Sequence, residues 1–543
     1  MTTKLDTDKR QRARSGGSRY TPLPWLAAHP WPRRALAAAG AAATVDRLVL
    51  ALALVLGAAL RLWQINSLGL NSDEAVYLGQ AAAIAGEPVL SQFFPIFRAH
   101  PLLFQFILAL AFPVGGTDGS DLVGRLVSVV VGLATVYLVY RAGGRLYGRR
   151  VGAIAALFLA LMPYHVVVTR QILLDGPMTL GATLSLYMMA RFAATERPAW
   201  LYAAGAGMGL TFLAKETGII LLGAIYAFLA MAPEIRFRLR DLALSTAIMA
   251  LVIAPFPLSI TLAGGGGSQR AHQYLVWQLF RRPNHEWTFY PSTVPLAIGP
   301  LLILTALLGL WLVRRRWSWQ EKLLVAWIAV PILFFQSWPT KGFQYLLPIA
   351  PPLAILAAQA VIQLGQRAAV SKIRHAGWLV PLMAGTIALT LLVPSWSRIQ
   401  TSTSDRFLAG SGGVPGGREA GEWIRENTPE GARFMTVGPS MANIIQFYGH
   451  RQGKGLSVSP NPLHRNPTYE PILNPDLQLR SGEIQYVVWD SFSAGRSPFF
   501  SKKLLSYVRR YHGRIVHTES IAVVAPDGSV VQKPVIVIYE VRP

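Results

Sequence analysis

The chain has 543 residues, of which 52% are hydrophobic and only 14% are charged. That charged share is roughly half that of an ordinary soluble domain, and the apolar residues gather in long runs, so a soluble enzyme and a disordered chain are both excluded. The absence of cysteine also excludes disulfides, zinc–thiolate sites and iron–sulfur clusters. The composition therefore predicts a polytopic membrane protein.

The first segment, residues 1–44, is polar and basic and carries no secretory signal. We expect it to form a disordered tail. Arg33 and Arg34 precede the first long apolar run and Arg47 lies at its start, so the positive-inside rule places this end in the cytoplasm. The formal net charge of +24 then reflects attraction to anionic membrane lipids, and we expect no nucleic-acid partner.

Eleven apolar runs are candidates for membrane-spanning helices. They are Val45–Trp63, Leu122–Tyr140, Val151–Val168, Ile172–Phe192, Trp200–Leu213, Gly218–Met231, Leu242–Leu262, Val294–Val313, Leu323–Phe335, Tyr345–Leu364 and Gly377–Val393. A further run, Pro101–Phe112, is too short to cross roughly 30 Å of hydrocarbon and is typical of an interfacial or re-entrant segment. With that topology almost every dense cluster of arginine and lysine lies in the cytoplasm. The sequence therefore predicts a polytopic α-helical membrane protein with about 11 transmembrane helices and an external C-terminal part.

From Arg398 onward the chain no longer contains long apolar runs. Gly410–Gly417 is rich in glycine and is typical of a linker. The residues after it predict an amphipathic helix at Glu419–Glu426 and short strands at Phe434–Val437, Tyr486–Trp489, Ile521–Ala525 and Val535–Tyr539. We therefore predict that residues 45–397 form the transmembrane domain and that residues 398–543 form a soluble α/β domain on the external face.

The first external loop, residues 64–100, contains the adjacent carboxylates Asp73 and Glu74. Close to the bilayer the lower dielectric raises the pKa of a carboxylate and makes it a better base. Alternatively, Ser72 or Asp73 caps a helix whose dipole favours Glu74. A cap would also fix the orientation of a catalytic side chain, so both interpretations can hold together.

Later external segments supply cations and another carboxylate. Arg170 and Asp175 lie five residues apart at the boundary of a span, where they either mark a site or form an ion pair that holds a helix end. Lys215 lies beside Glu216 between two short apolar runs, which favours a buried or cavity-lining position. Lys341 opens a late span, where it either belongs to a site or extends its amine toward the membrane surface.

The loop Ala263–Thr293 contains two weaker motifs. Gly264–Gly267 is not followed by Gly-Lys-Ser/Thr, so it predicts a flexible loop and not a phosphate-binding loop. His285 and Glu286 alone are too small a ligand set for us to predict a metal site, and a solvated loop is the simpler interpretation.

One topology thus places seven polar residues on the external side: Asp73, His100, Arg170, Asp175, Lys215, His285 and Lys341. Cations around a carboxylate at an apolar boundary suit a reaction in which an anionic lipid phosphate leaves.

Five motifs together resemble a known group of membrane enzymes. They are Asp73-Glu74 followed by Tyr77, His100-Pro101 before Leu102-Leu103-Phe104, the Arg170–Asp175 loop, Leu213-Ala214-Lys215, and Tyr345-Leu346-Leu347-Pro348 with Pro351-Pro352. In order and spacing they are similar to the membrane glycosyltransferases with the GT-C fold, in the branch of the protein O-mannosyltransferases and the bacterial lipid A aminoarabinose transferases. The resemblance covers roughly residues 45–365.

The resemblance implies an inverting sugar transfer from a polyprenyl-phosphate donor to an acceptor hydroxyl on the outer face of the cytoplasmic membrane. Asp73 would be the general base, and Glu74 and Tyr77 would position the substrates. The acceptor would be a lipid, a glycan or a protein. We predict no cofactor, because no ligand set is strong enough to predict a divalent metal.

The resemblance also implies roles for the cations. Arg170, Lys215 and Lys341 would contact the donor phosphate, and Asp175 would orient Arg170 or touch the sugar. His100, His285 and Tyr345 complete the expected substrate-binding residues. The chain departs from the family pattern at His100-Pro101-Leu102, where relatives often have a second proline, and at Glu216, where glycine is common.

Two other functions stay open at this point. A transporter or lipid flippase would share the intramembrane charges but should show an inverted repeat, and we find none in the sequence. A polymerase or ligase of cell-envelope glycans with a lipid-diphosphate donor would need additional external arginines, and Arg281 and Arg282 meet that need.

Overall fold

The computed structural model describes residues 30–97, 99–115, 120–263, 269, 272–274, 276–278, 280–281, 283–315, 317–371, 376–400, 414–524 and 528–542. Several expectations concern residues outside these ranges: the tail before residue 30, the glycine run Gly264–Gly267, Arg282, the linker up to Gly413, and Ala525. The chain divides into two compact units, Met1–Leu48 and Val49–Pro543, and the candidate site belongs to the second unit.

Helices dominate the part of the chain before residue 400. They are α2 (Pro30–Leu62), α3 (Ser72–Ile84), α4 (Pro88–Ser91), α5 (Leu103–Gly115), α6 (Ser120–Tyr147), α7 (Arg149–Leu161), α8 (Pro163–Thr169), α9 (Asp175–Thr195), α10 (Pro198–Ala214), α11 (Ile220–Met231), α12 (Leu239–Ile253), α13 (Pro255–Ala263), α15 (Phe289–Ile298), α16 (Pro300–Val313), α17 (Trp319–Ser337), α18 (Ala350–Val370) and α19 (Ala376–Ile399). Short 3-10 helices at Glu216–Ile219 and Phe343–Ile349 precede α11 and α18.

Five segments of the described chain are long and apolar enough to cross a membrane. They are Ala43–Leu62, Ser120–Tyr147, Leu239–Ala263, Phe343–Val370 and Gly377–Ile399. The number rises to seven if each of two bent helix pairs counts as one span. The chain is therefore a helical membrane protein, and the count of eleven spans stays a prediction.

Proline and glycine explain the two bends. The expected span Val151–Val168 is split into α7 and α8, which meet at 63°, because Pro163 cannot donate the hydrogen bond that would continue α7. The expected span Val294–Val313 is split into α15 and α16, which meet at 92°. Gly299 has a φ of 108° there, and Pro300 follows it at the start of α16.

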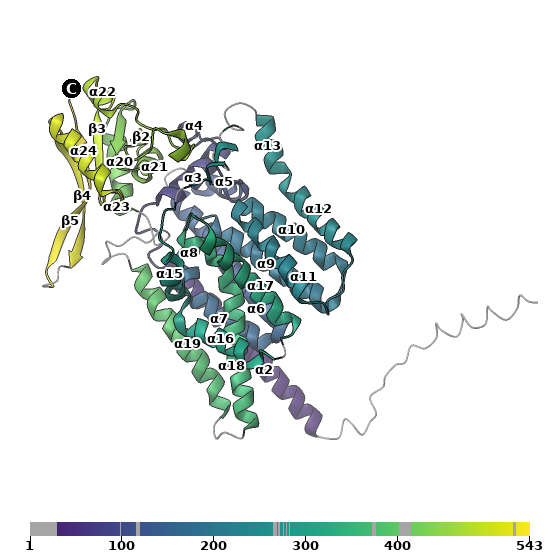
Figure 1. The fold of residues 1–543 in the computed structure, drawn as a ribbon. Coiled ribbons are helices and arrows are strands. Elements are labelled where there is room, and N and C mark those ends of the chain that lie inside the picture. Colours follow the sequence, from purple (N-terminus) through teal and green to yellow (C-terminus); the bar gives the residue numbers. More distant parts are fainter. Residues whose placement is uncertain are drawn as a thin grey trace, which may run out of the picture. The chain divides into compact units, whose positions relative to one another are not determined.

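The helices of the membrane part pack beside one another in a bundle (Figure 1). Glycine residues let some of them approach closely. A Cβ atom at Gly205 in α10 would lie 2.2 Å from the carbonyl oxygen of Ser245 in α12. A Cβ atom at Gly152 in α7 would lie 2.3 Å from the carbonyl oxygen of Tyr140 in α6. Larger side chains at these positions would push the helices apart, so we attribute the close packing to glycine.

The last part of the chain builds a five-stranded mixed sheet, drawn in green and yellow in Figure 1. The strands are β1 (Arg433–Thr436), β2 (Gln452–Gly455), β3 (Tyr486–Asp490), β4 (Arg514–Val524) and β5 (Val530–Glu540), in the order β2-β1-β3-β5-β4. β1 pairs in parallel with β2 and β3, and β5 pairs antiparallel with β3 and β4. The accompanying helices are α20 (Gly417–Asn427), α21 (Pro439–Tyr448), α22 (Pro475–Arg480), α23 (Ser491–Arg496) and α24 (Pro498–Arg510).

Specific polar contacts join this C-terminal part to the membrane part. Asp121 at the start of α6 accepts from the Arg418 guanidinium at 2.6 Å and from the Tyr448 hydroxyl at 3.1 Å. The Asn443 amide in α21 donates to the Ser72 hydroxyl at 2.9 Å, and α21 packs against α3. These contacts hold α21 directly beside the helix that carries Asp73.

Candidate active site

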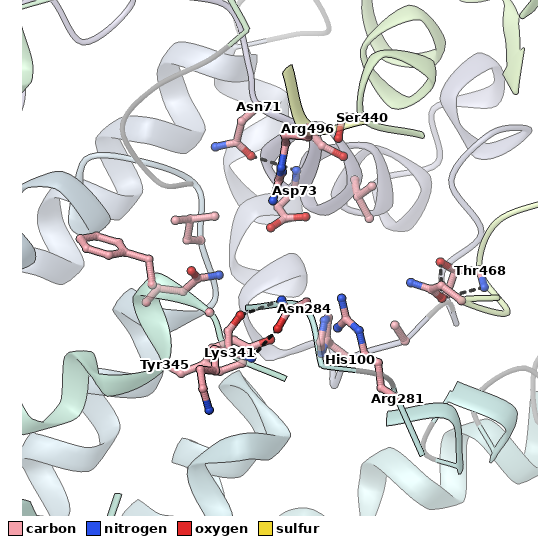
Figure 2. Close-up of a pocket in the computed structure, with 18 of the residues that line it drawn as sticks. Asn71, Asp73, His100, Arg281, Asn284, Lys341, Tyr345, Ser440, Thr468 and Arg496 are labelled. Atoms are coloured by element: carbon pink, nitrogen blue, oxygen red, sulfur yellow. Dashed lines mark hydrogen bonds between the residues drawn. The ribbon is translucent and has the colours of Figure 1, made fainter. Parts of the chain in front are cut away.

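A cavity of about 750 Å³ lies where several segments of the membrane part meet the C-terminal part. Its lining includes seven of the ten predicted site residues: Asp73, Tyr77, His100, Lys215, His285, Lys341 and Tyr345. Figure 2 shows Asp73 near the centre, with Asn71 and Arg496 above it and Lys341, Asn284 and Tyr345 below it in that view. Residues more than 250 positions apart in the sequence are thus brought to one space.

The start of α3 orients the two adjacent carboxylates differently. The helix cap is Asn71, and not Ser72 or Asp73 as the alternative interpretation had it: the Asn71 side chain accepts from the backbone N–H groups of Asp73 and Glu74 at 2.9 and 3.0 Å. In return, the Glu74 carboxylate accepts from the Asn71 N–H at 2.9 Å, which completes a capping box. Because Asn71 and Glu74 satisfy the helix end, Asp73 is not needed for capping.

Glu74 is completely buried and anchors α3 to the helix bundle. Its carboxylate forms an ion pair with Arg125 of α6 at 3.1 Å and accepts from the backbone N–H of Ile172 at 3.0 Å. Arg125 also donates to carbonyl oxygens of the segment before α3, including that of Gly69 at 2.9 Å. Glu74 does not line the cavity, so any effect it has on the substrates would be exerted through the position of α3.

Asp73 presents its carboxylate to the cavity. Its side chain is exposed there, and among the described residues no hydrogen bond or ion pair engages the carboxylate oxygens. Because the surrounding protein replaces bulk water, burial raises the pKa of Asp73 above its ordinary value of 3.8, against the opposing influence of Lys215 and His100. A carboxylate with a raised pKa and open lone pairs is suited to accept a proton.

Lys215 carries a buried charge that is paired within the protein. Its amine donates to both carboxylate oxygens of Asp175 at 2.8 Å, and the two residues are 4% and 2% exposed. Lys215 also lies 4.7 Å from the centre of the Tyr345 ring. Lys215 and Tyr345 reach the cavity lining, whereas Asp175 lies behind Lys215.

Asp175 pairs with Lys215, so it neither orients Arg170, one of the two roles that the resemblance implied, nor forms the ion pair with Arg170 that their spacing allowed. Arg170 follows the end of α8 and donates to the backbone carbonyl of Trp63 at 2.5 Å. Asp175 starts α9, which packs along α10 and so brings it to Lys215 at the end of α10. Arg170 is buried away from the cavity lining, and the expected contact with a donor phosphate has no support in this position.

His100 and Glu216 form a second pair at the cavity wall. The His100 Nδ1 atom lies 2.8 Å from the Glu216 carboxylate, and its Nε2 atom lies 3.4 Å from the Tyr274 hydroxyl. The Tyr77 ring meets the His100 ring edge-on at a centroid distance of 6.1 Å. Glu216, where the family pattern has glycine, thus holds the imidazole at the wall of the cavity.

Lys341 and Asn284 fix each other on another side of the cavity. The Asn284 side chain accepts from the Lys341 N–H at 2.8 Å and donates to the Lys341 carbonyl at 2.9 Å. The Lys341 amine donates to the carbonyls of Gln336 and Trp338, which end α17, at 2.9 and 3.0 Å. Lys341 is among the residues that line the cavity, and its amine also lies 5.4 and 5.6 Å from the centres of the Trp287 and Tyr290 rings.

Two cavity cations were not among the predicted site residues. Arg281 lies 4.6 Å from the centre of the Trp277 ring, and Arg496 of α23 lies 5.2 Å from that of Phe492. Within the described ranges neither guanidinium pairs with a carboxylate at 4.0 Å or less. Arg496 could not be found from the sequence, because nothing in its segment indicates contact with the segment that carries Asp73. Asn71 could have been found, since Asn-x-x-Glu is a capping-box signal.

His285 lines the cavity and stacks on Phe289 at a centroid distance of 4.1 Å. Among the described residues, no group of three or more histidine, aspartate or glutamate side chains is arranged so that it could hold a metal ion.

Comparison with known proteins supports the GT-C fold that the sequence predicts. Residues 99–260 match the family model of the dolichyl-phosphate-mannose-protein mannosyltransferases. The chain is 26% identical over 291 residues to an undecaprenyl phosphate-alpha-4-amino-4-deoxy-L-arabinose arabinosyl transferase of Aeromonas salmonicida (strain A449). That similarity covers 49% of this chain and 50% of the relative, so the chain matches half the length of this curated protein.

Solved structures resemble nearly the whole chain. ArnT from Cupriavidus metallidurans in the apo state has a TM-score of 0.64 at 16% identity and covers 92% of this chain and 98% of its own. The same protein bound to undecaprenyl phosphate has a TM-score of 0.62 at 16% identity, covering 90% and 97%. The oligosaccharyltransferase AglB from Archaeoglobus fulgidus, in complex with an inhibitory peptide and a dolichol-phosphate, has a TM-score of 0.57 at 15% identity, covering 90% and 74%. The predicted GT-C fold is thereby confirmed.

Proposed function

We propose that the protein is an inverting glycosyltransferase that moves a sugar from a polyprenyl-phosphate donor to an acceptor hydroxyl. The observation that carries this proposal is the open carboxylate of Asp73 in a large cavity whose wall also holds Lys215, Arg281 and Lys341. A base and several cations in one space suit a reaction that deprotonates one oxygen and releases another as phosphate. The similarity to enzymes that use lipid-linked donors supports the same reaction.

In the proposed reaction Asp73 accepts the proton of the acceptor hydroxyl. The acceptor oxygen bonds to the anomeric carbon as the bond from that carbon to the phosphate oxygen breaks on the opposite face, which inverts the configuration. The electron pair of the broken bond stays on the leaving polyprenyl phosphate. Its growing negative charge is stabilised by the nearby cations.

The cations differ in how freely they can meet a phosphate. Lys215 is held by Asp175, and His100 by Glu216, so these two groups have fixed positions. Lys341 and Arg281 lack a carboxylate partner in the described part of the chain and are suited to compensate the phosphate charge. We assign Tyr77, Tyr345 and His285 to the walls that orient the sugar, because each lines the cavity.

We further propose that the cavity faces the outside of the cytoplasmic membrane. The eleven spans expected from the sequence put the arginine clusters around Arg145 and Arg315 in the cytoplasm. The N-terminal tail then lies inside, and residues 398–543 form an external domain. This orientation would give a lipid-linked donor and an external acceptor access to Asp73 from the same side.

A second candidate is transfer from a lipid-diphosphate donor, as in a cell-envelope glycan polymerase or ligase. Arg281 favours it, because this guanidinium lines the cavity and stacks on Trp277. A diphosphate donor would use Arg281 for its additional charge. The experiment below distinguishes the two donor classes.

The proposal is tested by donor consumption. Purified protein in detergent is incubated with a panel of polyprenyl-monophosphate and polyprenyl-diphosphate sugars, and released lipid phosphate is measured by mass spectrometry. We expect release of a polyprenyl monophosphate by the wild type and none by Asp73→Asn. Release of diphosphate only would favour the second candidate, and binding of every donor without Asp73-dependent release would contradict transfer.

A further inference from the structure

A second, smaller cavity lies beside the candidate active site. Its volume is about 290 Å³, close to the lower end of the range for ligand pockets at roughly 300 Å³. It lies between the segment Gln92–Pro95, helix α21, strand β2 and the loop Pro467–Glu470. Thr468 and Tyr469 line both this cavity and the larger one, so the two spaces share a wall.

The lining of the smaller cavity is rich in side-chain amides, contributed by Gln92, Asn443, Gln446 and Gln452. We call this space the amide cavity. Each amide both donates and accepts hydrogen bonds, which is the chemistry that sugar hydroxyl groups require. Phe93 and Tyr469 add aromatic faces on which the apolar face of a sugar ring can pack.

The linings of the two cavities differ in how much positive charge lacks a carboxylate partner. Lys454, the basic residue of its lining, forms an ion pair with Glu470 at 2.9 Å, so its charge is already compensated. The larger cavity instead carries Arg281, Lys341 and Arg496 without carboxylate partners in the described ranges. An anionic ligand would therefore favour the larger cavity, whereas the amide cavity suits a neutral ligand with many hydroxyl groups.

The amide cavity also adjoins the residue assigned as base. Asn443 of its wall donates to the hydroxyl of Ser72, which precedes Asp73. In the view of Figure 2, Thr468 lies to one side of Asp73, and Lys341 and Tyr345 lie to the other. A chain of sugars that passes Thr468 would thus reach Asp73 from the side away from Lys341.

We propose that the acceptor is a neutral oligosaccharide, whose terminal sugar presents its hydroxyl to Asp73 while the next units occupy the amide cavity. The inference rests on the proposed function only for the fate of that hydroxyl. Binding of the oligosaccharide does not depend on a donor and can be measured separately.

The test is binding of acceptor candidates to the full-length protein in detergent, without donor. Fluorescently labelled protein is applied to an array of short neutral oligosaccharides, together with lipid A and serine-containing peptides. The neutral oligosaccharides that bind are then titrated against wild type, Gln446→Ala and Gln92→Ala. We expect neutral oligosaccharides to bind and each variant to weaken the affinity by roughly twofold to tenfold, the effect of one lost hydrogen bond.

Gln532→Ala is the matched control, because Gln532 is exposed on β5 outside the lining of either cavity. It should bind as the wild type does. Since Gln446 also donates to the carbonyl of Gly453 at 3.1 Å, the thermal unfolding of each variant is compared with that of the wild type. Gln92, whose amide donates to Pro88 at the start of α4, provides an independent variant.

Three results would overturn the inference: no saturable binding of any neutral oligosaccharide, binding of lipid A or peptides alone, or wild-type affinity in both folded variants. Donor consumption is measured on the same samples. If Gln446→Ala and Gln92→Ala weaken binding of the oligosaccharide but no donor is consumed, the result contradicts the transferase proposal and still supports the oligosaccharide site.

Discussion

Three consecutive residues at the start of α3 have three different roles. Ser72 accepts from Asn443 of α21, Asp73 faces the cavity, and Glu74 is buried in an ion pair with Arg125. The sequence predicted a functional role for the adjacent carboxylates Asp73 and Glu74, because they lie close to a membrane span. It proposed Ser72 or Asp73 as the helix cap and missed Asn71, since Ser, Asp and Asn all favour that position.

The raised pKa of Asp73 predicts an acidic limb in the pH profile of the reaction. The base acts only as a carboxylate, and burial raises its pKa above 3.8. As the pH falls through that raised pKa, Asp73 is protonated and kcat/KM should decrease. The measurement is kcat/KM for donor consumption from pH 3 to pH 8. An acidic limb that lies at or below the ordinary aspartate value, or that persists unchanged in Asp73→Asn, would contradict the assignment.

At the scale of elements, the position of α3 depends on the ion pair between Glu74 and Arg125. The partners are 0% and 4% exposed in their side chains. Periodicity and hydropathy predicted most helices, but this long-range pair could not be predicted, because Arg125 looked like an ordinary residue of the span that begins near Leu122.

We expect Glu74→Gln to destabilise the protein strongly. The variant keeps the shape of the side chain but leaves the Arg125 charge buried without compensation, which typically costs about 3–5 kcal/mol. The measurement is thermal unfolding in detergent. Glu234→Gln is the control, because Glu234 pairs with Lys322 at the surface with 41% of its side chain exposed, and such pairs contribute roughly 0–1 kcal/mol. Equal unfolding temperatures for the two variants would contradict the anchoring role.

The strand β2 shows why some elements could not be predicted from the sequence. The strand β2 (Gln452–Gly455) reads Gln-Gly-Lys-Gly and lacks the β-branched and aromatic residues that indicate strands. It is a strand because its backbone pairs with β1. In contrast, β1, β3 and β5 overlap the strands expected at Phe434–Val437, Tyr486–Trp489 and Val535–Tyr539, whose apolar residues gave a local signal.

At the scale of the whole molecule, the residues of the site come from segments that lie far apart in the sequence, between different apolar runs. Four residues of the membrane part, Asp73, His100, Lys215 and Lys341, line one cavity, and the C-terminal part adds Arg496. The cations could be predicted because charges at span boundaries are conspicuous. The partner of each charge depends on three-dimensional packing, as the pairing of Asp175 with Lys215 in place of Arg170 illustrates.

The proposed orientation in the membrane predicts the location of two positions. Reporter fusions after Tyr147 should be cytoplasmic, and fusions after Arg398 should be external, because the arginine clusters stay on the cytoplasmic side. Alkaline phosphatase and a fluorescent protein that matures only in the cytoplasm report the two sides. The reverse assignment at either position would contradict the topology and the external cavity.

The most direct test of the central claim separates chemistry from binding at Asp73. Single-turnover transfer and equilibrium donor binding are compared for wild type and Asp73→Asn, with the donor found in the consumption assay. The account predicts a chemical step slower by roughly 10²–10⁴-fold, the usual contribution of a general base, with donor affinity nearly unchanged. Single-turnover rates within a few-fold of the wild type in Asp73→Asn would show that Asp73 is not the base.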